Sequence, residues 1–317
     1  MQAPPFFVSF ENRDDFYSAL SKETLVEHKQ ELEALLDKKL PPVVSIRCLA
    51  TLFGYSPKFV GSLMYRTDKY YRIFKIRSGK KKRVIEAPKV GLKVVQKWLA
   101  AHLSQAVSFD ECVYGFVQGR SYISAAKRHT KAAWVYSIDI KDFFQRTPTE
   151  KLVLAFKELG YSEEASEIAA KLCSYKGHLA QGSPASPVLS NVVFRRLDKK
   201  INKLASDLGV TYTRYADDLV FSGSKDFPEK IREVKALVEE QGWELAEHKE
   251  HLAKLPNRLK VHGLLVHGDN VRLTKGYRNK IRAYQHMLDA KKISAEDVCK
   301  IKGHITLAQH IESEANP

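Results

Sequence analysis

The chain has 317 residues, of which 44% are hydrophobic and 28% charged, which excludes a disordered chain and a small stapled module and leaves room for two or three packed units. Lysine and arginine number 52 against 37 aspartate and glutamate, so the formal net charge is +15. A positive field of this size attracts polyanions, and nucleic acid is therefore the first partner that we expect.

The cysteines and the N-terminus indicate the compartment. The four cysteines lie far apart without a Cys-x-x-Cys pair, which argues against a disulfide framework and against a cysteine zinc site. The first ten residues lack the basic and apolar regions of a signal peptide, and no window approaches the roughly 20 apolar residues of a membrane span. We therefore expect a soluble protein in a reducing cytoplasm.

The first half of the chain contains a strongly basic block. After a helix predicted over 25–36, residues 66–97 hold twelve basic and two acidic side chains, which is two-thirds of the net charge. From Tyr70, aromatic or aliphatic residues alternate with basic ones at period two, which predicts a basic β-hairpin over 70–87. We expect it to contact nucleic acid through Lys80, Lys81 and Lys82. The alternative is a solvated edge hairpin whose lysines only prevent aggregation.

Strands and helices alternate from Trp134 onward. A strand over 135–140 places Asp139 on the face opposite to Tyr136 and Ile138, because side chains alternate along a strand. Three helices are predicted next: one around 152–159, one that starts after the cap Ser162, and one over 187–208 with Ser186 as N-cap. Two strands follow, over 210–215 and 219–222. The last predicted elements are a helix over 228–241 and strands near 243–246 and 260–266. This order predicts a split βαβ layout, one sheet backed by helices.

Three carboxylates are the candidates for chemistry. Asp139 lies on a strand, whereas Asp217 and Asp218 form the tip of a hairpin, where an Asp-Asp pair usually serves the turn. Adjacent carboxylates between apolar strands repel each other unless a cation is bound. Aspartate oxygens together with substrate phosphates suit Mg²⁺, and two such ions stabilise the attacking and leaving oxygens in phosphoryl transfer.

Three motifs resemble those of reverse transcriptases. Residues 215–218, Tyr-Ala-Asp-Asp, resemble the Y-x-D-D box, residues 137–144 resemble the first aspartate motif, and residues 180–187 resemble the Q-G-x-P-x-S-P loop between them. The resemblance implies an α+β right-hand polymerase fold with a ferredoxin-like palm, a basic fingers hairpin and a helical thumb. The parts would be an N-terminal helical region over 1–60, fingers over 61–133, a palm over 134–268 with finger-palm helices over 149–208, and a thumb over 269–317.

The resemblance also implies roles for individual residues. Asp139, Asp217 and Asp218 would be catalytic and, with Ile140, would hold two Mg²⁺ ions. Phe144 would be a steric gate that excludes the 2′-OH of a ribonucleotide, although Phe143 is an equal candidate on spacing alone. Gly182 has no Cβ, so a backbone at this position can approach a base pair closely. The nucleotide-binding set would comprise Arg83 on the triphosphate, Ile140, Phe144, Gln181, Gly182, and Lys249 near the pyrophosphate.

Within that family the chain most resembles the retron-type enzymes, through residues 211–219. Residues 125–129, Ala-Ala-Lys-Arg-His, stand where these enzymes have N-A-x-x-H, and Val261-His262-Gly263 stands where they have V-T-G. Contacts to nucleic acid are therefore implied for His129, Tyr215, His262 and Gly263. The resemblance further implies dNTP substrates, a dedicated structured RNA, priming from the 2′-OH of an internal guanosine, RNA-linked multicopy single-stranded DNA, and a separate effector protein in phage defence.

The C-terminal region is also basic. Residues 272–302 hold nine basic and three acidic side chains at helical spacing, which suggests a thumb that follows duplex phosphates, or else a solvated pair of basic helices. A zinc site at His248 and His251 is not expected, because the spacing lacks the i, i+4 geometry. The alternatives are a reverse transcriptase of another class, such as a group II intron-like enzyme, a related RNA polymerase or primase, and an inactive RNA-binding scaffold that restrains an effector.

Overall fold

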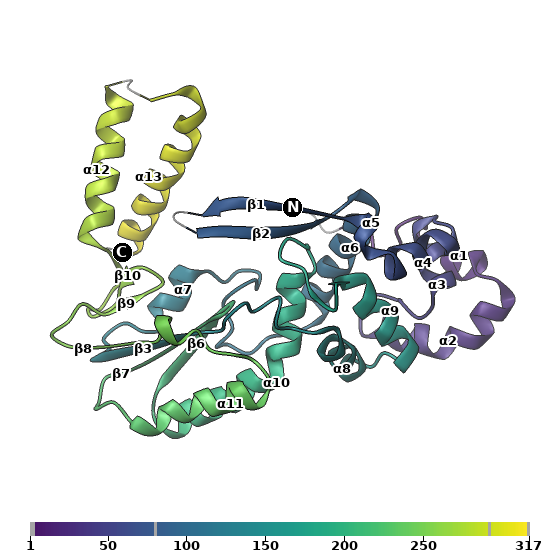
Figure 1. Ribbon diagram of the computed structural model, residues 1–317, viewed down its shortest axis with the longest axis horizontal. Coiled ribbons are helices and arrows are strands. Elements are labelled where there is room, and N and C mark those ends of the chain that lie inside the picture. Colours follow the sequence, from purple (N-terminus) through teal and green to yellow (C-terminus); the bar gives the residue numbers. More distant parts are fainter. Residues whose placement is uncertain (1–3, 79–80, 291–292, 316–317) are drawn as a thin grey trace. The chain divides into compact units, whose positions relative to one another are not determined.

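The chain forms two units in a computed structural model that describes residues 4–78, 81–290 and 293–315 (Figure 1). Both units are built from segments that are discontinuous in the sequence, and helix α10 (Ser186–Asp207) runs from one unit into the other. Unit 1 comprises Met1–Asp110, Lys141–Arg196 and Gly242–Glu244, and unit 2 comprises Glu111–Ile140, Leu197–Gln241 and Leu245–Pro317. The expected division into four parts stays a prediction.

Unit 1 is mostly helical and contains a hydrophobic core, whose largest side chains include Phe16, Trp98 and Phe156. Serine side chains cap several of its helices, and Ser162 accepts a hydrogen bond from the Ala165 amide as expected from the sequence. The helices are α1 (Arg13–Ala19), α2 (Lys22–Asp37), α3 (Ile46–Phe53), α4 (Pro57–Tyr65), α5 (Thr67–Tyr70), α6 (Val90–Ala106), α8 (Thr149–Leu159) and α9 (Glu163–Cys173).

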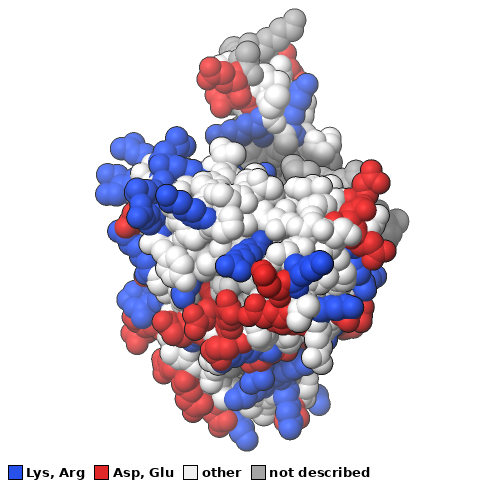
Figure 2. All heavy atoms as spheres, turned by 90° about the vertical axis from the view of Figure 1, so that its right-hand side faces the viewer, with Lys and Arg blue, Asp and Glu red and all other residues white. Residues whose placement is uncertain are grey.

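The basic hairpin of unit 1 forms as predicted. Strands β1 (Tyr71–Ser78) and β2 (Lys81–Pro88) pair antiparallel, with Phe74 opposite Ile85 and Ile76 opposite Arg83. A second, short hairpin consists of β4 (Ser174–Tyr175) and β5 (His178–Leu179). On the face of the molecule in Figure 2, Lys and Arg side chains gather in one dense cluster, whereas elsewhere acidic and basic side chains are mixed.

Unit 2 is built around a four-stranded antiparallel sheet in the order β6 (Thr211–Tyr215), β7 (Asp218–Gly223), β3 (Trp134–Asp139) and β8 (His251–Lys254). The third strand of this order comes first in the chain, which is the strand order of a ferredoxin-like sheet and confirms the split βαβ prediction. The helical elements of unit 2 that precede its C-terminal part are α7 (Tyr122–Lys127), the second half of α10, the 3₁₀ segments η1 (Glu229–Glu233) and η2 (Glu247–Lys249), and α11 (Val234–Glu240).

The two faces of this sheet differ in character. Tyr136 and Ile138 are buried and share a face with Tyr212 and Arg214, which hydrogen-bond to Asp198 of α10. Helices α10 and α11 run along one side of this sheet (Figure 1). Asp139 and Ser137 point to the other face and are half-buried, as the alternation of the sequence predicted. Val135 and other apolar residues of that second face join a core with the C-terminal region.

The C-terminal part of unit 2 begins with a three-stranded sheet and ends with two helices. The sheet consists of β9 (Lys260–Val261), β10 (Leu264–Leu265) and β11 (Arg272–Leu273). Helices α12 (Lys275–Asp289) and α13 (Ala295–Ala315) lie side by side, and the hydroxyl of Tyr277 lies 2.9 Å from Nδ1 of His304 (Figure 1). In the described residues, no helix is both long and apolar enough to cross a membrane.

Three predicted elements were wrong in detail. The expected strand at 243–246 is absent from the described residues, because only Leu245 makes a β-bridge, to Ile140. The strand expected over 260–266 is broken into β9 and β10 by a tight turn at His262 and Gly263, both with positive φ. Helix α10 begins at Ser186 itself, whose hydroxyl donates to the Ala180 carbonyl at 2.7 Å instead of capping the helix.

Candidate active site

The three aspartates of the sequence motifs meet at one end of the sheet of unit 2. Asp139 ends β3 directly opposite Asp218, the first residue of β7. Residues opposite each other in antiparallel strands point to the same face, with Cβ atoms about 5 Å apart. Asp217 precedes Asp218 in the β6–β7 turn, and its carbonyl accepts a hydrogen bond of 2.9 Å from the Ile140 amide. The fold therefore brings all three carboxylates together.

Crowding and burial make these carboxylates electrostatically costly. Burial, and next the neighbouring carboxylate of Asp139, raise the pKa of Asp217 above its ordinary value. Two cationic or polar groups offset the charge nearby: the Lys249 ammonium, carried by η2, forms an ion pair with Asp139, and Nδ1 of His262 lies 3.1 Å from Oδ2 of Asp218. The site therefore attracts positive charge.

The carboxylate oxygens of the three aspartates are the type of ligand that Mg²⁺ prefers. Carboxylate oxygens are hard ligands, and their mutual repulsion is relieved by a divalent cation. Within the described residues, however, no group of three or more His, Cys, Asp or Glu side chains is arranged to enclose a metal ion. In proteins, Mg²⁺ generally keeps several waters and binds one or two carboxylates together with substrate phosphates. Ile140 could offer a metal ligand only through its main chain, since its side chain is buried and apolar.

The expected nucleic-acid contacts near these aspartates are partly enclosed. The ring of His262 packs 5.3 Å from that of Tyr215 between centroids, and its side chain is 8% exposed. Its Nε2 is buried without a hydrogen-bond partner among the described residues. Gly263 completes the same turn with φ of +84°. His262 thus lies at the same end of the sheet as the three aspartates, with its ring turned to Asp218 and Tyr215 and largely hidden from solvent.

His129 lies where its ring cannot reach a ligand. The side chain is fully buried next to the sheet, with Nδ1 2.7 Å from the Ser222 hydroxyl and Nε2 2.7 Å from the Thr213 hydroxyl. Burial lowers its pKa from 6.5 to about 3, so the ring is neutral. The expected direct contact with nucleic acid does not fit this position, because both nitrogens are already engaged. His129 instead joins the segment after α7 to strands β6 and β7.

The remaining expected nucleotide contacts belong to unit 1. Arg83 is exposed on β2, and the neighbouring Lys82 is exposed as well. Lys80 and the side chain of Lys81 lie outside the described residues. Phe143 is buried against Phe194 and Trp243, whereas Phe144 is only half-buried. The structure thus separates the two phenylalanines that spacing alone left equal.

The loop at Gln181 and Gly182 is fastened to the basic hairpin. The Gln181 amide donates to the Glu86 carboxylate at 3.2 Å, and its carbonyl accepts from the Glu86 amide at 2.9 Å. Gly182 has φ of +136°, and a Cβ there would lie 2.9 Å from a methyl of Ile85 and 3.0 Å from the Glu86 carbonyl. The close approach that requires glycine is therefore to strand β2. Oε1 of Gln181 accepts from the side-chain Nε2 of Gln145 at 3.0 Å.

Sequence reasoning missed several residues that shape these sites. Glu86 had no assigned role, although it binds the main chain of Gln181. Arg214 immediately precedes the Tyr-Ala-Asp-Asp box, and it forms a buried ion pair with Asp198. The available signal was alternation in β6, which places Arg214 on the apolar face of the sheet, where a charged side chain needs a partner.

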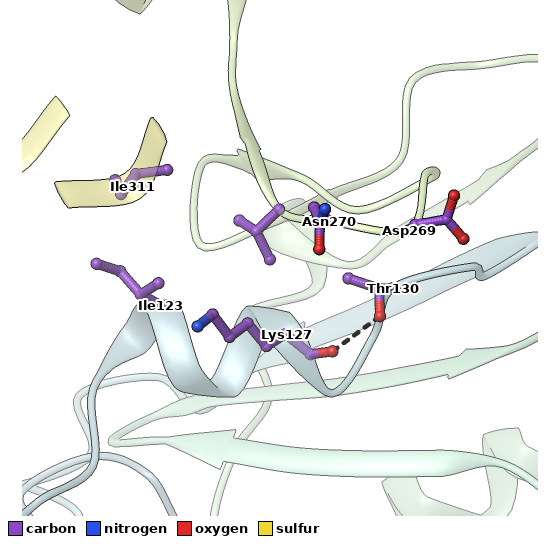
Figure 3. A pocket seen from close by; sticks show the side chains of 7 residues that line it. Ile123, Lys127, Thr130, Asp269, Asn270 and Ile311 are labelled. Atoms are coloured by element: carbon purple, nitrogen blue, oxygen red, sulfur yellow. Dashed lines mark hydrogen bonds between the residues drawn. The ribbon is translucent and has the colours of Figure 1, made fainter. Parts of the chain in front are cut away.

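Two cavities of unit 2 are lined by other residues than the three aspartates. One, of about 200 Å³, lies between α7, the loop before β11 and α13, with Ile123 and Ile311 on facing sides (Figure 3). The Thr130 hydroxyl beside it donates to the Lys127 carbonyl at 3.0 Å. The other, of about 250 Å³, is lined by Glu111, Cys112, Arg128, Asn202, Ser206, Val210, Thr211 and Tyr212.

Comparison with known proteins identifies the family. The chain is 28% identical to the Retron Ec86 reverse transcriptase of Escherichia coli over 282 residues, which cover 87% of this chain and 88% of that protein. It is 32% identical to the Retron Mx162 reverse transcriptase of Myxococcus xanthus over 215 residues, 58% of this chain and 44% of that protein.

Among solved structures, telomerase from Candida albicans with a fragment of telomeric RNA aligns at a TM-score of 0.47 and 12% identity, over 69% of this chain and 50% of that one. A family model described as reverse transcriptase (RNA-dependent DNA polymerase) matches residues 75–284. This match spans well over half of the chain, and we conclude that the protein belongs to the reverse transcriptase family.

Proposed function

We propose that this protein is a retron-type RNA-directed DNA polymerase, which copies a dedicated structured non-coding RNA into RNA-linked multicopy single-stranded DNA. The observation that carries the proposal is the meeting of Asp139, Asp217 and Asp218 at one end of the sheet, in a chain of the reverse transcriptase family. Its similarity to a retron enzyme over 87% of the chain supports the retron type.

The carboxylates would act as ligands. Asp139 and Asp217 would hold two Mg²⁺ ions, with Asp218 completing the acidic cluster. Bound Mg²⁺ supplies activation of the attacking primer hydroxyl and neutralisation of the triphosphate charge. His262 holds the Asp218 carboxylate through Nδ1, and the Ile140 amide holds the Asp217 carbonyl, so the protein fixes two of the three aspartates before any ligand arrives.

The other residues would bind the nucleotide. Lys249 ion-pairs with Asp139 in the structure, and on substrate binding its ammonium would turn to the pyrophosphate and donate a proton to it. Arg83 would bind the triphosphate as a planar, permanently charged donor. Gln181 and Gly182 would shape the nucleotide pocket, and Phe144 would exclude the 2′-OH. Exposed basic side chains of α12 would bind the phosphates of a duplex; they are Lys275, Arg278, Lys280 and Arg282.

Co-expression tests the proposal. The gene is expressed with its adjoining non-coding genomic region, and cells are examined for a short DNA whose mobility changes after RNase treatment. We expect this DNA with the wild type and its loss in Asp217→Asn, which keeps the size of the side chain but removes its charge. A phage challenge of the same strains tests the defence role and any effector protein encoded beside it.

The outcomes separate the alternatives. If no RNA-linked DNA forms but the purified protein extends a generic primed RNA with dNTPs, the retron type is wrong and another class of reverse transcriptase remains. Preference for NTPs over dNTPs would indicate the RNA polymerase or primase. If the protein extends neither its adjoining non-coding RNA nor a generic primed RNA, and Asp217→Asn still protects cells against phage, the protein is an RNA-binding scaffold.

A further inference from the structure

A buried charged side chain lies directly beneath the catalytic turn. Arg214 of β6 is 0% exposed and Asp198 of α10 is 1% exposed. The guanidinium grips the carboxylate with two hydrogen bonds, Nε to Oδ1 at 2.8 Å and Nη2 to Oδ2 at 2.6 Å. The Tyr212 hydroxyl donates to the same Oδ1 at 2.9 Å. A strand and a helix of the same unit are thereby joined through one carboxylate.

The third arm of the guanidinium reaches the turn itself. Nη1 of Arg214 donates to the carbonyl of Ala216 at 3.0 Å. This carbonyl belongs to the peptide that joins Ala216 to Asp217. Ala216 has φ of +57°, a left-handed conformation that costs energy for a residue with a Cβ and persists only where the surroundings enforce it. Arg214 supplies part of that enforcement.

A second segment holds the same turn from another side. The Arg214 amide donates to the Cys112 carbonyl at 2.7 Å, and the Arg214 carbonyl accepts from the Tyr114 amide at 2.8 Å. At Gly115 a Cβ would lie only 2.3 Å from the amide nitrogen of Ala216. Residues 112–115 therefore pack against the turn, and there is no space for a side chain at Gly115.

We infer that Arg214, held by Asp198, is a positioning residue that fixes the Ala216–Asp217 peptide and thereby orients Asp217 for metal binding and nucleotidyl transfer. A buried ion pair is poor evidence for stability, because well-packed apolar side chains of similar size often serve the fold as well or better. The rigid fork of arginine binds a carboxylate and a carbonyl at fixed angles, which lysine and apolar residues do not. The inference rests on the proposed polymerase activity.

The test replaces the network without leaving a buried charge. In the triple variant Asp198→Leu, Tyr212→Phe and Arg214→Met, we expect the melting temperature to stay near that of the wild type. The kcat for dNTP incorporation on a primed RNA should fall roughly 10- to 100-fold, as for a small misplacement of a catalytic group, with little change in KM for the dNTP. The Mg²⁺ concentration for half-maximal rate should rise.

A single variant and a control complete the design. Arg214→Lys keeps the charge against Asp198 but loses the fork, and we expect it to fold with reduced kcat and raised Mg²⁺ demand. Tyr136→Phe removes a hydroxyl of β3 that donates to Glu250, just before β8, and it should lower stability without changing kcat. If Arg214→Lys keeps wild-type kcat and Mg²⁺ dependence, the inference is wrong whether or not the triple variant folds.

A readout without turnover separates this inference from the proposed function. Mn²⁺ that binds the native aspartates raises the melting temperature in a concentration-dependent way. We expect Arg214→Lys to require several-fold more Mn²⁺ than the wild type for the same rise. If the wild type extends no primer but this difference is found, the polymerase proposal fails and the positioning role stands. An unchanged Mn²⁺ response in a folded Arg214→Lys would overturn the positioning role.

Discussion

At the scale of single residues, the structure gives the physical reason for the glycine at position 182 of the Gln-Gly motif. Its φ of +136° and its approach to the main chain of Glu86 leave no room for a Cβ. Gly182→Ala should destabilise unit 1 by about 2 to 3 kcal/mol, because the backbone must leave an almost glycine-only region and move off β2. Thermal and urea unfolding measure the loss.

Gly177→Ala is the matched control for Gly182→Ala. Gly177 also has positive φ, +81°, but among the described residues other than its two chain neighbours no atom lies within 4 Å of its expected Cβ. The control variant should therefore lose only the conformational term, about 1 kcal/mol. Equal losses in the two variants would mean that the contact with β2 is unimportant.

His129 predicts a dependence of stability on pH. Its folded pKa of about 3 lies below the unfolded value of 6.5, because the ring is buried and next because His262 and Arg128 lie nearby. Between these values the unfolded chain binds more protons, so stability falls as the pH falls. From pH 7 to pH 5, His129 alone should remove about 2 kcal/mol of the free energy of unfolding.

His129→Gln isolates this effect. A glutamine can still bond to the hydroxyls of Thr213 and Ser222, but it does not titrate. Urea unfolding at pH 7, 6 and 5 should show a shallower pH dependence in the variant by about the same 2 kcal/mol over the range. Parallel curves for the two proteins would contradict the buried, neutral state of His129.

Replacing Phe143 and replacing Phe144 by alanine should have different effects. Phe144→Ala should relax discrimination against ribonucleotides by a factor on the order of tenfold, because the variant lacks the ring that would meet a 2′-OH. Phe143→Ala should instead cost about 3 to 5 kcal/mol of stability, since that ring is buried against Phe194 and Trp243. Incorporation of rNTP against dNTP is measured for both. Relaxed discrimination in Phe143→Ala alone would reverse the assignment.

At this scale the sequence predicted what is local. The alternation of β3 was enough to place Asp139 on the face opposite to Tyr136, and the motif spacing was enough to identify the aspartates. The partner of Arg214 could not be predicted, because Asp198 lies on a helix 16 residues earlier and only the packing of α10 on β6 brings them together. The burial of His129 was missed for the same reason, since Thr213 and Ser222 are distant in sequence.

At the scale of elements, prediction succeeded where a periodic pattern and a cap coincided. The hairpin β1–β2 and strands β6 and β7 lie within a residue or two of their predicted ranges, and helix α9 begins directly after its predicted cap Ser162. It failed after Gly242, where the apolar residues Trp243 and Leu245 suggested a strand. Trp243 packs instead with Phe143, and only Leu245 forms a bridge, so tertiary packing overrode local propensity.

The cap of α9 gives a prediction at this scale. Ser162 is exposed and its hydroxyl accepts from the Ala165 amide at 3.2 Å, so Ser162→Ala should cost about 1 kcal/mol, as for other helix caps. Ser162→Thr keeps the hydroxyl and should restore most of the loss. The melting temperatures of the two variants measure this difference. If alanine and threonine are equivalent, the hydroxyl contributes nothing to the helix.

At the scale of the whole molecule, the net charge of +15 and its concentration in the basic block predict binding that depends strongly on salt. Each phosphate neutralised by a lysine or arginine releases counterions, so log K falls linearly with log of the salt concentration. Lys75, Arg77 and Lys82 are exposed along the hairpin. Replacing all three by alanine should weaken RNA binding and reduce the slope by up to about 2 to 3 units if each contacts a phosphate.

The control for this variant removes the same charge elsewhere. Lys22, Lys29 and Lys58 are exposed on α2 and α4, and their replacement by alanine lowers the net charge equally. Contacts with phosphates change the slope, whereas a diffuse field changes mainly the rate of association. Fluorescence titrations of a primed RNA between 50 and 200 mM KCl, about the range in which such binding changes most, measure both variants. If the two variants have equal salt-dependence slopes, Lys75, Arg77 and Lys82 serve solubility, because a solvated edge hairpin also needs charges against aggregation.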